Sequence, residues 1–448
     1  MIYWISINRK EYVMEQKHET SFVTETIKEK PINKKKLFRR TITTIVFAIV
    51  FGLIACLTFI LIEPVINNIL NPEEITKVKF PEEEQEVKPE ELLTEDEIAQ
   101  QEESIQEVVE AAKEVVESGQ NEMTSIDTYE KIYADFQRLA KEAGKSIVTV
   151  VGITEQQDWF AGITENENTT SGLIVAENGV EVLILADAGN LQNAGEYYVR
   201  FFDKQTVEAE LKNMDAQTGL AVYAVDLSGL PKETKENITF ATLGSSTGEN
   251  LVGSPMIAIG APYGTSGSLS YGMITSNGTK LNLADAIYNV ITTDMSMSQN
   301  ASGAVMNLHG EVVGIITKSA ASKVDAGTIS AIGISDIKTL IAKLSNDEER
   351  AYVGIKGMDV TEEAHEETGV PFGVYVSEVI TGSPAMAAGI QNGDVIVNLG
   401  KQSVTSFREF RAGVFSLEPN MIVEVTLMRF NGTEYNEINL EITTGEAK

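Results

Sequence analysis

From about residue 127 onward, the chain consists of short runs of β-branched and aliphatic residues separated by glycine-containing turns. The clearest runs are residues 146–153, 171–176, 180–185, 197–202, 220–225, 256–259 and 312–317. Short strands at this spacing are typical of an all-β barrel or sandwich. The pattern therefore predicts a mostly β domain over residues 127–346.

A second folded unit is predicted over residues 350–448. Residues 335–344 form a helical stretch, and Ser345-Asn346-Asp347 breaks it. From Tyr352 to about Thr444 the sequence mixes strands with short helices. A chain of 448 residues is long enough for two or three domains, which agrees with this division.

An uncharged stretch, residues 41–62, is rich in Ile, Val, Phe, Leu and Ala. As a helix it spans ~33 Å, which matches the hydrocarbon core of a bilayer. Basic residues precede it and acidic residues follow it, so the basic tail, residues 1–40, is expected in the cytoplasm. We therefore expect one transmembrane helix over residues 41–63, with the β-rich domains outside the cytoplasm at the cell membrane.

Two other interpretations of this stretch stay open. It could be a buried core helix, although it has no polar face. It could also be a lipidation signal, because Leu53-Ile54-Ala55-Cys56 has the form of a lipoprotein cleavage site. Against lipidation, the apolar run continues past Cys56, and the preceding tail is longer than a usual signal region. Residues 1–13 differ in character from the tail that follows, so Met14 is an alternative start to Met1.

Residues 64–126 are expected to form an acidic linker. Its first part contains Pro72, Pro81 and Pro89 and should be extended. Apolar residues at 3–4 spacing predict an amphipathic helix over residues 94–117, capped by Thr94 with Glu97 three residues on. So short and acidic a helix is interpreted as a solvated spacer, with a weak oligomerisation coil as the alternative.

The net charge of −31 limits the partners of this chain. So acidic a protein should repel nucleic acid, and no nucleic-acid partner is expected. The sequence has no cysteine–histidine cluster and no glycine-rich phosphate loop, so no metal or cofactor is expected. The acidic run between Asp359 and Glu367 fits no EF-hand loop and is interpreted as a solvated face.

Three groups of motifs follow one another along the chain. The first comprises Ala241-Thr-Leu-Gly244, Val252-Gly253, Ile257-Ala-Ile-Gly260-Ala-Pro-Tyr-Gly264 and Gly272-Met-Ile-Thr-Ser276; the second Thr293-Asp294, Ala301-Ser302-Gly303 and Asn307-Leu-His-Gly310-Glu-Val-Val-Gly314-Ile; the third Ser383-Pro384-Ala385, Ala388-Gly389-Ile390 and Gly393-Asp394-Val395-Ile396. In this order and spacing they resemble the HtrA-type (Do-like) serine proteases over about residues 127–446. The resemblance implies a chymotrypsin-like double β-barrel followed by a PDZ domain.

The resemblance places Ser302 at the position of the nucleophile. A serine in a glycine-flanked loop can expose its backbone N–H in a tight turn, as an oxyanion hole requires. The same residues also form ordinary turns. The loop departs from the family pattern, since Asn300 stands where glycine is usual and one glycine after Gly303 is absent.

The catalytic triad implied by the resemblance is degenerate. Acyl transfer by serine needs a base and a group that orients the base. The base position falls on Ala186, and the orienter position falls on Gly219. Of the three histidines, His18 precedes the apolar stretch and His365 lies in the second unit. His309 is expected in a hairpin turn at the far end of a ~23 Å strand from Ser302.

Other residues could act as the base only under special conditions. Lys280 and Lys318 are the nearest lysines in sequence to the relevant strands, but a catalytic lysine must be buried to lower its pKa. Both are expected among polar residues at strand ends. Asp187 is expected to be exposed and therefore too weak a base for a serine hydroxyl.

In the PDZ-like unit, residues 352–355 (Tyr352-Val353-Gly354-Ile355) resemble the loop that holds a peptide's terminal carboxylate with backbone N–H groups. Ile355 and Val414 are expected to line the pocket for the last side chain. The alternative is that this segment is simply the first strand, with its edge covered by another part of the chain.

These features predict a membrane-anchored HtrA-like pseudoprotease outside the cytoplasm, binding peptide C-termini or unfolded proteins in envelope protein quality control. The alternative is an active serine endopeptidase that uses Ser302 with a non-standard base. A homotrimer is expected from the resemblance alone.

Overall fold

The structure is a computed structural model that describes residues 51, 76–81, 126–158, 162–248, 250–323 and 327–447. The chain divides into two units, Met1–Glu73 and Glu74–Lys448. Apart from Phe51, the predicted tail, the transmembrane helix 41–63 and the helix 94–117 lie outside the described residues. Within the part that is described, no helix combines the length and apolar character needed to cross a bilayer.

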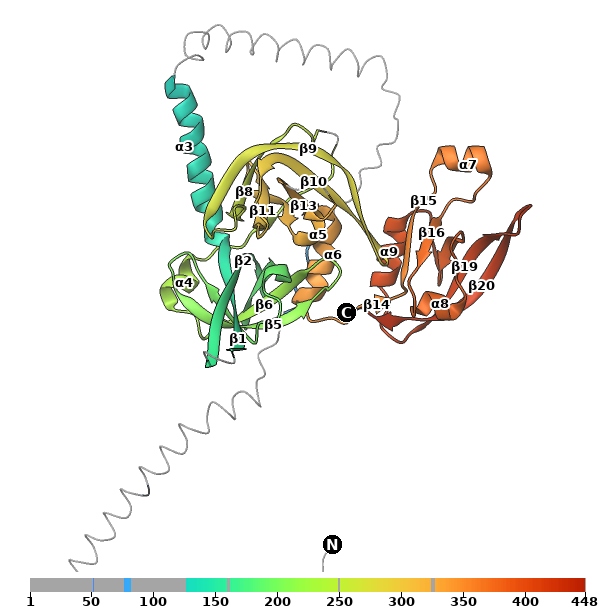
Figure 1. Cartoon of the computed structure of the whole chain (residues 1–448), viewed down its shortest axis with the longest axis horizontal. Helices are drawn as coiled ribbons and strands as arrows, with labels where there is room; N and C mark the ends of the chain where they lie inside the picture. Colours follow the sequence, from blue (N-terminus) through green and yellow to red (C-terminus); the bar gives the residue numbers. More distant parts are fainter. Residues whose placement is uncertain are drawn as a thin grey trace, which may run out of the picture. The chain divides into compact units, whose positions relative to one another are not determined.

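Helix α3, Ile126–Ala143, precedes the barrels and was not predicted from the sequence (Figure 1). Its C-terminal end packs on the protein through the buried Ala140. Phe136 stacks on Tyr271, with ring centroids 5.1 Å apart. Ile126 and Tyr129, near its start, are exposed. The apolar residues of this helix do recur at helical spacing, so the signal was present in the sequence.

Six antiparallel strands close into the first barrel, in the order β1-β2-β3-β6-β5-β4. They are β1 Ile147–Asp158, β2 Gly162–Glu177, β3 Glu181–Asp187, β4 Glu196–Arg200, β5 Thr206–Met214 and β6 Leu220–Asp226. Strands β3 and β6 are apolar almost throughout, because they pair with each other in the middle of the sheet and are buried. The short helices around this barrel are η1 Gly144–Ser146, η2 Ala188–Asn190 and α4 Lys232–Asn237.

The second barrel is a sheet that closes because β11 pairs with both β8 and β12. Its strands are β8 Pro255–Ala261, β9 Ser268–Leu283, β10 Ala286–Ser296, β11 Ser302–Asn307, β12 Glu311–Ile316 and β13 Thr328–Gly333, with β7 Thr242–Leu243 added alongside β12. Helix α5, Lys318–Ala321, follows β12. The predicted double β-barrel is thus confirmed (Figure 1).

One hydrophobic cluster joins the two barrels. It combines Leu185 of the first barrel and Ile315 of the second with Leu340 of helix α6, Ile334–Ser345. Burying this apolar area at roughly 25 cal/mol per Å² fixes the barrels against each other. The two barrels therefore pack against each other through a continuous apolar interface.

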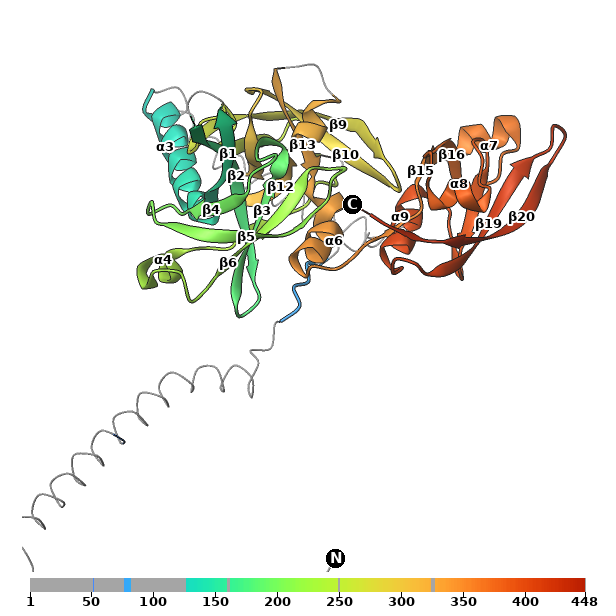
Figure 2. The same cartoon turned by 60° about the horizontal axis from the view of Figure 1, so that its bottom comes forward.

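The PDZ domain follows α6 and has its own core around Phe410 and Leu427. Its strands are β14 Ala351–Tyr352, β15 Ile355–Asp359, β16 Val374–Val379, β17 Val395–Leu399, β18 Gln402–Ser403, β19 Ile422–Phe430, β20 Tyr435–Thr443 and β21 Gly445–Glu446, and its helices are α7 Glu362–Thr368, α8 Pro384–Ala388 and α9 Phe407–Phe415. Strand β15 is an edge of the main sheet, and β19 and β20 form a long hairpin (Figure 2).

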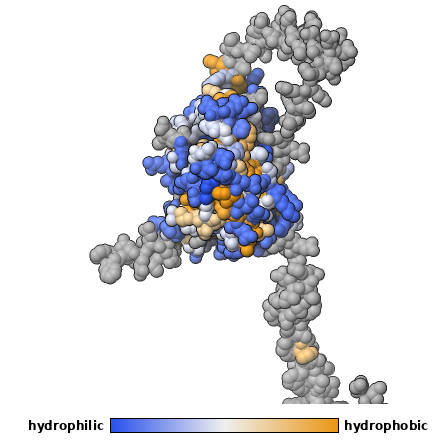
Figure 3. Space-filling model, turned by 90° about the vertical axis from the view of Figure 1, so that its right-hand side faces the viewer, coloured by the Kyte–Doolittle hydropathy of each residue, from blue (hydrophilic) through white to orange (hydrophobic). Residues whose placement is uncertain are grey.

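Hydrophilic residues dominate the face shown in Figure 3, with smaller apolar patches between them. Exposed apolar side chains of the PDZ domain include Met386, Met421, Ile422 and Phe430. Such scattered residues are ordinary on a soluble domain and do not mark a site.

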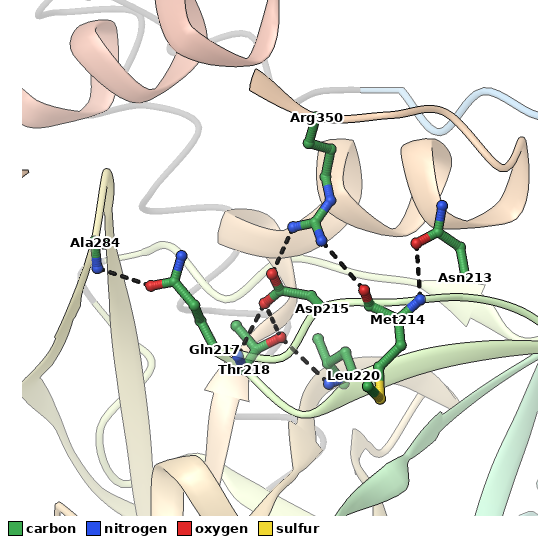
Figure 4. Close-up of polar contacts among 8 residues, drawn as sticks. All are labelled: Asn213, Met214, Asp215, Gln217, Thr218, Leu220, Ala284 and Arg350. Carbon is green, nitrogen blue, oxygen red and sulfur yellow. Dashed lines mark hydrogen bonds and ion pairs between the residues drawn. The ribbon is translucent and has the colours of Figure 1, made fainter. Parts of the chain in front are cut away.

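The two domains share a buried ion pair. Arg350, between α6 and β14, donates to Asp215 in the turn between β5 and β6 and to the Met214 carbonyl 3.2 Å away (Figure 4). Asp215 also accepts from the N–H and hydroxyl of Thr218. The side chains of Arg350 and Asp215 are 6% and 4% exposed, so solvent does not screen this pair.

Replacing Arg350 with Ala should destabilise the protein strongly, because Asp215 then stays buried as an uncompensated charge. The expected loss in unfolding free energy is roughly 3–5 kcal/mol. Denaturant titration measures it. The double variant Arg350→Met, Asp215→Asn should lose clearly less, since it leaves no unpaired charge; equal losses for the two proteins would contradict the explanation.

Candidate active site and peptide-binding loop

Ser302 begins strand β11 and is fully buried. Its Oγ accepts a hydrogen bond from the Ser171 N–H of β2, at 2.9 Å. The residue pairs with Ala261 of β8, so the predicted nucleophile is part of a regular strand. The preceding amide, Ala301 N–H, donates to the Ser298 carbonyl at 3.2 Å. The hydroxyl thus points into the protein, and the Ala301 amide is used within its own turn.

The predicted base and orienter positions hold no group that can move a proton. Ala186 lies in β3, buried in the core of the first barrel between Gly172 and Ala221. Gly219 lies in the turn before β6 with φ 81°. A Cβ atom at Gly219 would stand 2.9 Å from Oδ1 of Asp187. The backbone at Gly219 is therefore shaped for glycine.

Helix η2 is a part of the site that the sequence analysis missed. The side-chain amide of Asn190 donates to the Asn300 carbonyl at 3.3 Å, so η2 lies against the nucleophile loop. Gly189 is the residue before Asn190 and carries no side chain. The sequence does contain a signal for this contact. Ala188-Gly189-Asn190 directly follows strand β3, and a side chain just after this strand can reach the loop that contains Ser302.

Asp187 is buried, and the prediction that it is exposed was wrong. Its two carboxylate oxygens accept from the N–H groups of Gly189 at 2.9 Å and Lys318 at 2.8 Å. Burial raises the pKa of the Asp187 carboxyl, and the two backbone hydrogen bonds oppose this rise. Asp187 caps η2 and positions the start of α5.

The two candidate lysines are engaged elsewhere. Lys318 is exposed, and its Nζ donates to the Gly189 carbonyl at 2.9 Å. Nζ of Lys280 donates to the side-chain oxygen of Asn289 across the β9–β10 hairpin. Ser302 Oγ is bonded to a backbone amide rather than to either lysine.

Neither described histidine approaches Ser302. His309 is exposed in the turn between β11 and β12, as predicted. Its backbone N–H donates to Oδ1 of Asn307 at 2.9 Å. His365 lies in α7, stacked on Phe372 with centroids 4.2 Å apart. His18 lies outside the described residues. The described residues contain no group of three or more His, Cys, Asp or Glu side chains arranged for a metal ion.

The predicted carboxylate-binding loop of the PDZ domain does surround a carboxylate, that of Asp285. The N–H groups of Val353, Gly354 and Ile355 donate to its two oxygens at 2.7–3.0 Å. Gly354 has φ 89°, and a Cβ atom there would stand 2.3 Å from Cβ of Ser383. The loop therefore needs glycine, as the sequence analysis expected.

The other residues predicted to bind a peptide, Tyr352, Ile355 and Val414, lie beside Asp285 or in the PDZ core. Tyr352 and Val414 line a cavity together with Asp285. Ile355 and Val414 are fully buried in the PDZ core. Asp285 itself sits at the tip of the β9–β10 hairpin, so a part of the protease-like domain covers the loop.

Burial dominates the electrostatics of Asp285. It raises the pKa of this carboxyl to about 6, although the three amide donors favour the charged form. The folded state therefore binds a proton that the unfolded state releases between about pH 3.8 and pH 6. The stability from this group is fully present below pH 3.8 and is lost as the pH rises through 6.

The Asp285→Asn variant, which cannot ionise, should lack this pH dependence. From pH 4 to pH 7 the unfolding free energy of the wild type should fall relative to that of the variant, by about 3 kcal/mol at most. Denaturant titrations at the two pH values measure the difference. Glu208→Gln, at an exposed position of β5, is the control and should follow the wild type; a constant difference between wild type and Asp285→Asn would contradict the assignment.

Two family models match the chain in its folded part. Residues 170–315 match the trypsin-like peptidase domain, and residues 345–443 match the PDZ domain. The HtrA-type protease AlgW, solved with a decapeptide, has the same fold, with a TM-score of 0.51 and 23% identity over 70% of this chain and 99% of that chain.

Curated relatives are bacterial HtrA proteases. Serine endoprotease DegS of Haemophilus influenzae is 32% identical over 250 residues, which cover 53% of this chain and 68% of DegS. Periplasmic pH-dependent serine endoprotease DegQ of Escherichia coli is 28% identical over 266 residues, 57% of this chain and 56% of DegQ. The match spans only 49% of a probable DegP-like endoprotease of Rhizobium meliloti. By its two domains and its similarity to DegS, this chain belongs to the HtrA family of serine proteases.

Proposed function

We propose that this chain is a membrane-anchored, extracytoplasmic HtrA-like pseudoprotease. Its function is to bind peptide C-termini or unfolded proteins through the PDZ domain in envelope protein quality control. The proposed loss of proteolysis rests on one observation: Ser302 is buried with its Oγ held by the Ser171 amide, and the base and orienter positions hold Ala186 and Gly219.

The chemistry of acyl transfer explains why this observation matters. A serine hydroxyl is a weak nucleophile until a base takes its proton in the same step. Loss of the base lowers turnover by roughly 10⁶ in a protease of this kind. Here the hydrogen bond at Ser302 Oγ comes from a donor, the Ser171 N–H, which cannot take the hydroxyl proton.

The second candidate is an active serine endopeptidase that uses Lys318. The observation in its favour is the hydrogen bond from Lys318 Nζ to the Gly189 carbonyl, which brings an amine to η2 beside the nucleophile loop. Catalysis by this route requires Ser302 Oγ to leave the Ser171 amide and requires Lys318 to lose its contact with solvent.

Peptide binding is supported by the three amides of Val353, Gly354 and Ile355. Three converging N–H groups in an otherwise buried loop form a site for one carboxylate. The carboxylate at the end of a peptide can accept hydrogen bonds from these three donors, and β15 is an edge strand beside them.

Membrane attachment is supported by the uncharged residues 41–62 and their basic flank. Assembly as a homotrimer is proposed from membership of the HtrA family. Neither cofactor nor nucleic acid has a part in this proposal.

The purified protein should not cleave unfolded casein, and a fluorophosphonate probe should not label it. The reason is that Ser302 has no base and is buried. Gel electrophoresis and in-gel fluorescence measure both. Cleavage or labelling that disappears in Ser302→Ala would contradict the pseudoprotease proposal, and a further loss of activity in Lys318→Ala would then identify Lys318 as the base.

Residues 348–448, which contain the PDZ core, should bind peptides with a free C-terminus in preference to their amidated copies. Amidation removes the charged carboxylate to which the three N–H groups would donate and should weaken binding at least ~10-fold. Gly354→Val should do the same, because its side chain collides with Ser383. Fluorescence anisotropy measures both effects; an unchanged affinity after amidation would rule out the carboxylate-loop assignment.

A further inference from the structure

The tip of the β9–β10 hairpin, residues 282–287, lies along the edge of the PDZ sheet. In Figures 1 and 2 the hairpin reaches from the second barrel to α9. The Asp285 N–H donates to the Ile355 carbonyl at 2.8 Å, and the Asn282 side chain donates to the Gly357 carbonyl at 2.8 Å. The hairpin tip therefore contacts β15 through hydrogen bonds at two points.

The direction of this segment matches that of a peptide added to a sheet edge. Asp285 lies opposite Ile355, and Asn282 lies opposite Gly357, so residues 282–285 run antiparallel to β15. Asp285 is then in the place of a last residue: its N–H contacts the strand, and its carboxylate fills the amide loop. A bound peptide places its C-terminal carboxylate at this point by the same strand addition.

Side chains next to Asp285 strengthen the contact. Ile287 packs against the PDZ core, and its carbonyl accepts from Arg411 of α9 at 3.1 Å. Phe415, at the end of α9, packs against the cluster that joins the barrels. The hairpin tip is thus held between β15 and α9, the two elements that border the amide loop.

The backbone of the hairpin indicates that Asp285 is placed by this contact. The turn consists of Ala284 and Asp285 between the paired residues Leu283 and Ala286. Asp285 has φ 60°, a conformation that is uncommon for residues other than glycine. Ala284 N–H donates to Oε1 of Gln217 at 2.8 Å, which fixes the tip from the side of the first barrel.

We propose that the hairpin tip, residues 282–287, is a resident ligand of the PDZ domain, and that a peptide C-terminus binds this protein only by displacing the Asp285 carboxylate from the loop of Val353, Gly354 and Ile355. This inference rests on the proposed peptide-binding function. One loop cannot hold two carboxylates. The apparent affinity for peptide is therefore the affinity of the free loop multiplied by the fraction of molecules in which Asp285 does not occupy it.

The test compares the full chain, purified in mild detergent, as wild type, Asp285→Asn, Asp285→Gly and Glu208→Gln. The probes are fluorescein-labelled decapeptides of Gly and Ser that end in Val, Ile, Leu or Phe, each with a free or an amidated C-terminus. Asp285→Asn keeps the shape of the side chain and removes its charge. Asp285→Gly keeps the turn, since glycine adopts φ 60° without strain. Glu208→Gln removes one exposed charge far from the loop in sequence.

Both Asp285 variants should bind the free-carboxylate peptides at least about 10-fold more tightly than the wild type, because the loop is vacant in a larger fraction of molecules. Glu208→Gln should bind as the wild type does. Equal, amidation-sensitive affinity in all four proteins would overturn the resident-ligand inference and leave the proposed peptide binding intact. If no protein prefers a free carboxylate, the proposed peptide binding itself fails, and the inference fails with it.

Hydrogen exchange gives a readout that needs no peptide. The amides of Val353, Gly354 and Ile355 should exchange slowly in the wild type, because Asp285 accepts from all three. They should exchange at least about 10-fold faster in both Asp285 variants and remain slow in Glu208→Gln. Rapid exchange of these amides in the wild type would overturn the inference, whatever the peptides do.

Discussion

The contact between the Asp285 carboxylate and three backbone amides of the PDZ domain connects the two halves of this protein. A buried carboxylate is tolerated only where its oxygens are fully hydrogen-bonded, and here three N–H groups supply the partners. Around it, the Arg350–Asp215 ion pair and the packing of Phe415 on the barrel cluster act between the same two domains. These contacts together hold the PDZ domain, and the Asp285 carboxylate is the one that the proposed peptide ligand would replace.

The turn between β5 and β6 contacts both the domain interface and the degenerate catalytic region. On one side, Asp215 and Gln217 bind Arg350 and the Ala284 amide. On the other side, Gly219 accepts from the Ala188 N–H of η2 at 2.8 Å, and η2 contacts the nucleophile loop. Contact alone does not establish coupling. The contacts do place the hairpin tip and η2 on the same turn.

The sequence predicted the architecture well because local patterns determine it. Strand runs, the glycine-flanked segment around Ser302 and Gly354 all carry their signals within a few residues, although Ser302 itself begins strand β11 and does not lie in the expected tight turn. The contact of Asp285 with residues 353–355 joins positions about 70 apart, and no periodicity or motif reports such a pairing. The burial of Asp187 was missed for the same reason: the partner that covers it, Lys318, comes from the other barrel. Helix α3 was missed although its apolar spacing was legible.

The packing around Asp187 is fitted to glycine at two neighbouring positions, Gly219 and Gly189. A side chain at Gly219 would need φ 81° and would meet Oδ1 of Asp187, which is itself held by the Gly189 amide. A side chain at Gly189 would in turn meet Asp187 and the stem of Lys318. Asp187 therefore occupies the space into which an orienting carboxylate or a base would project. These positions are linked through Asp187: for the proposed pseudoprotease, a side chain introduced at Gly219 or Gly189 would first have to displace this carboxylate.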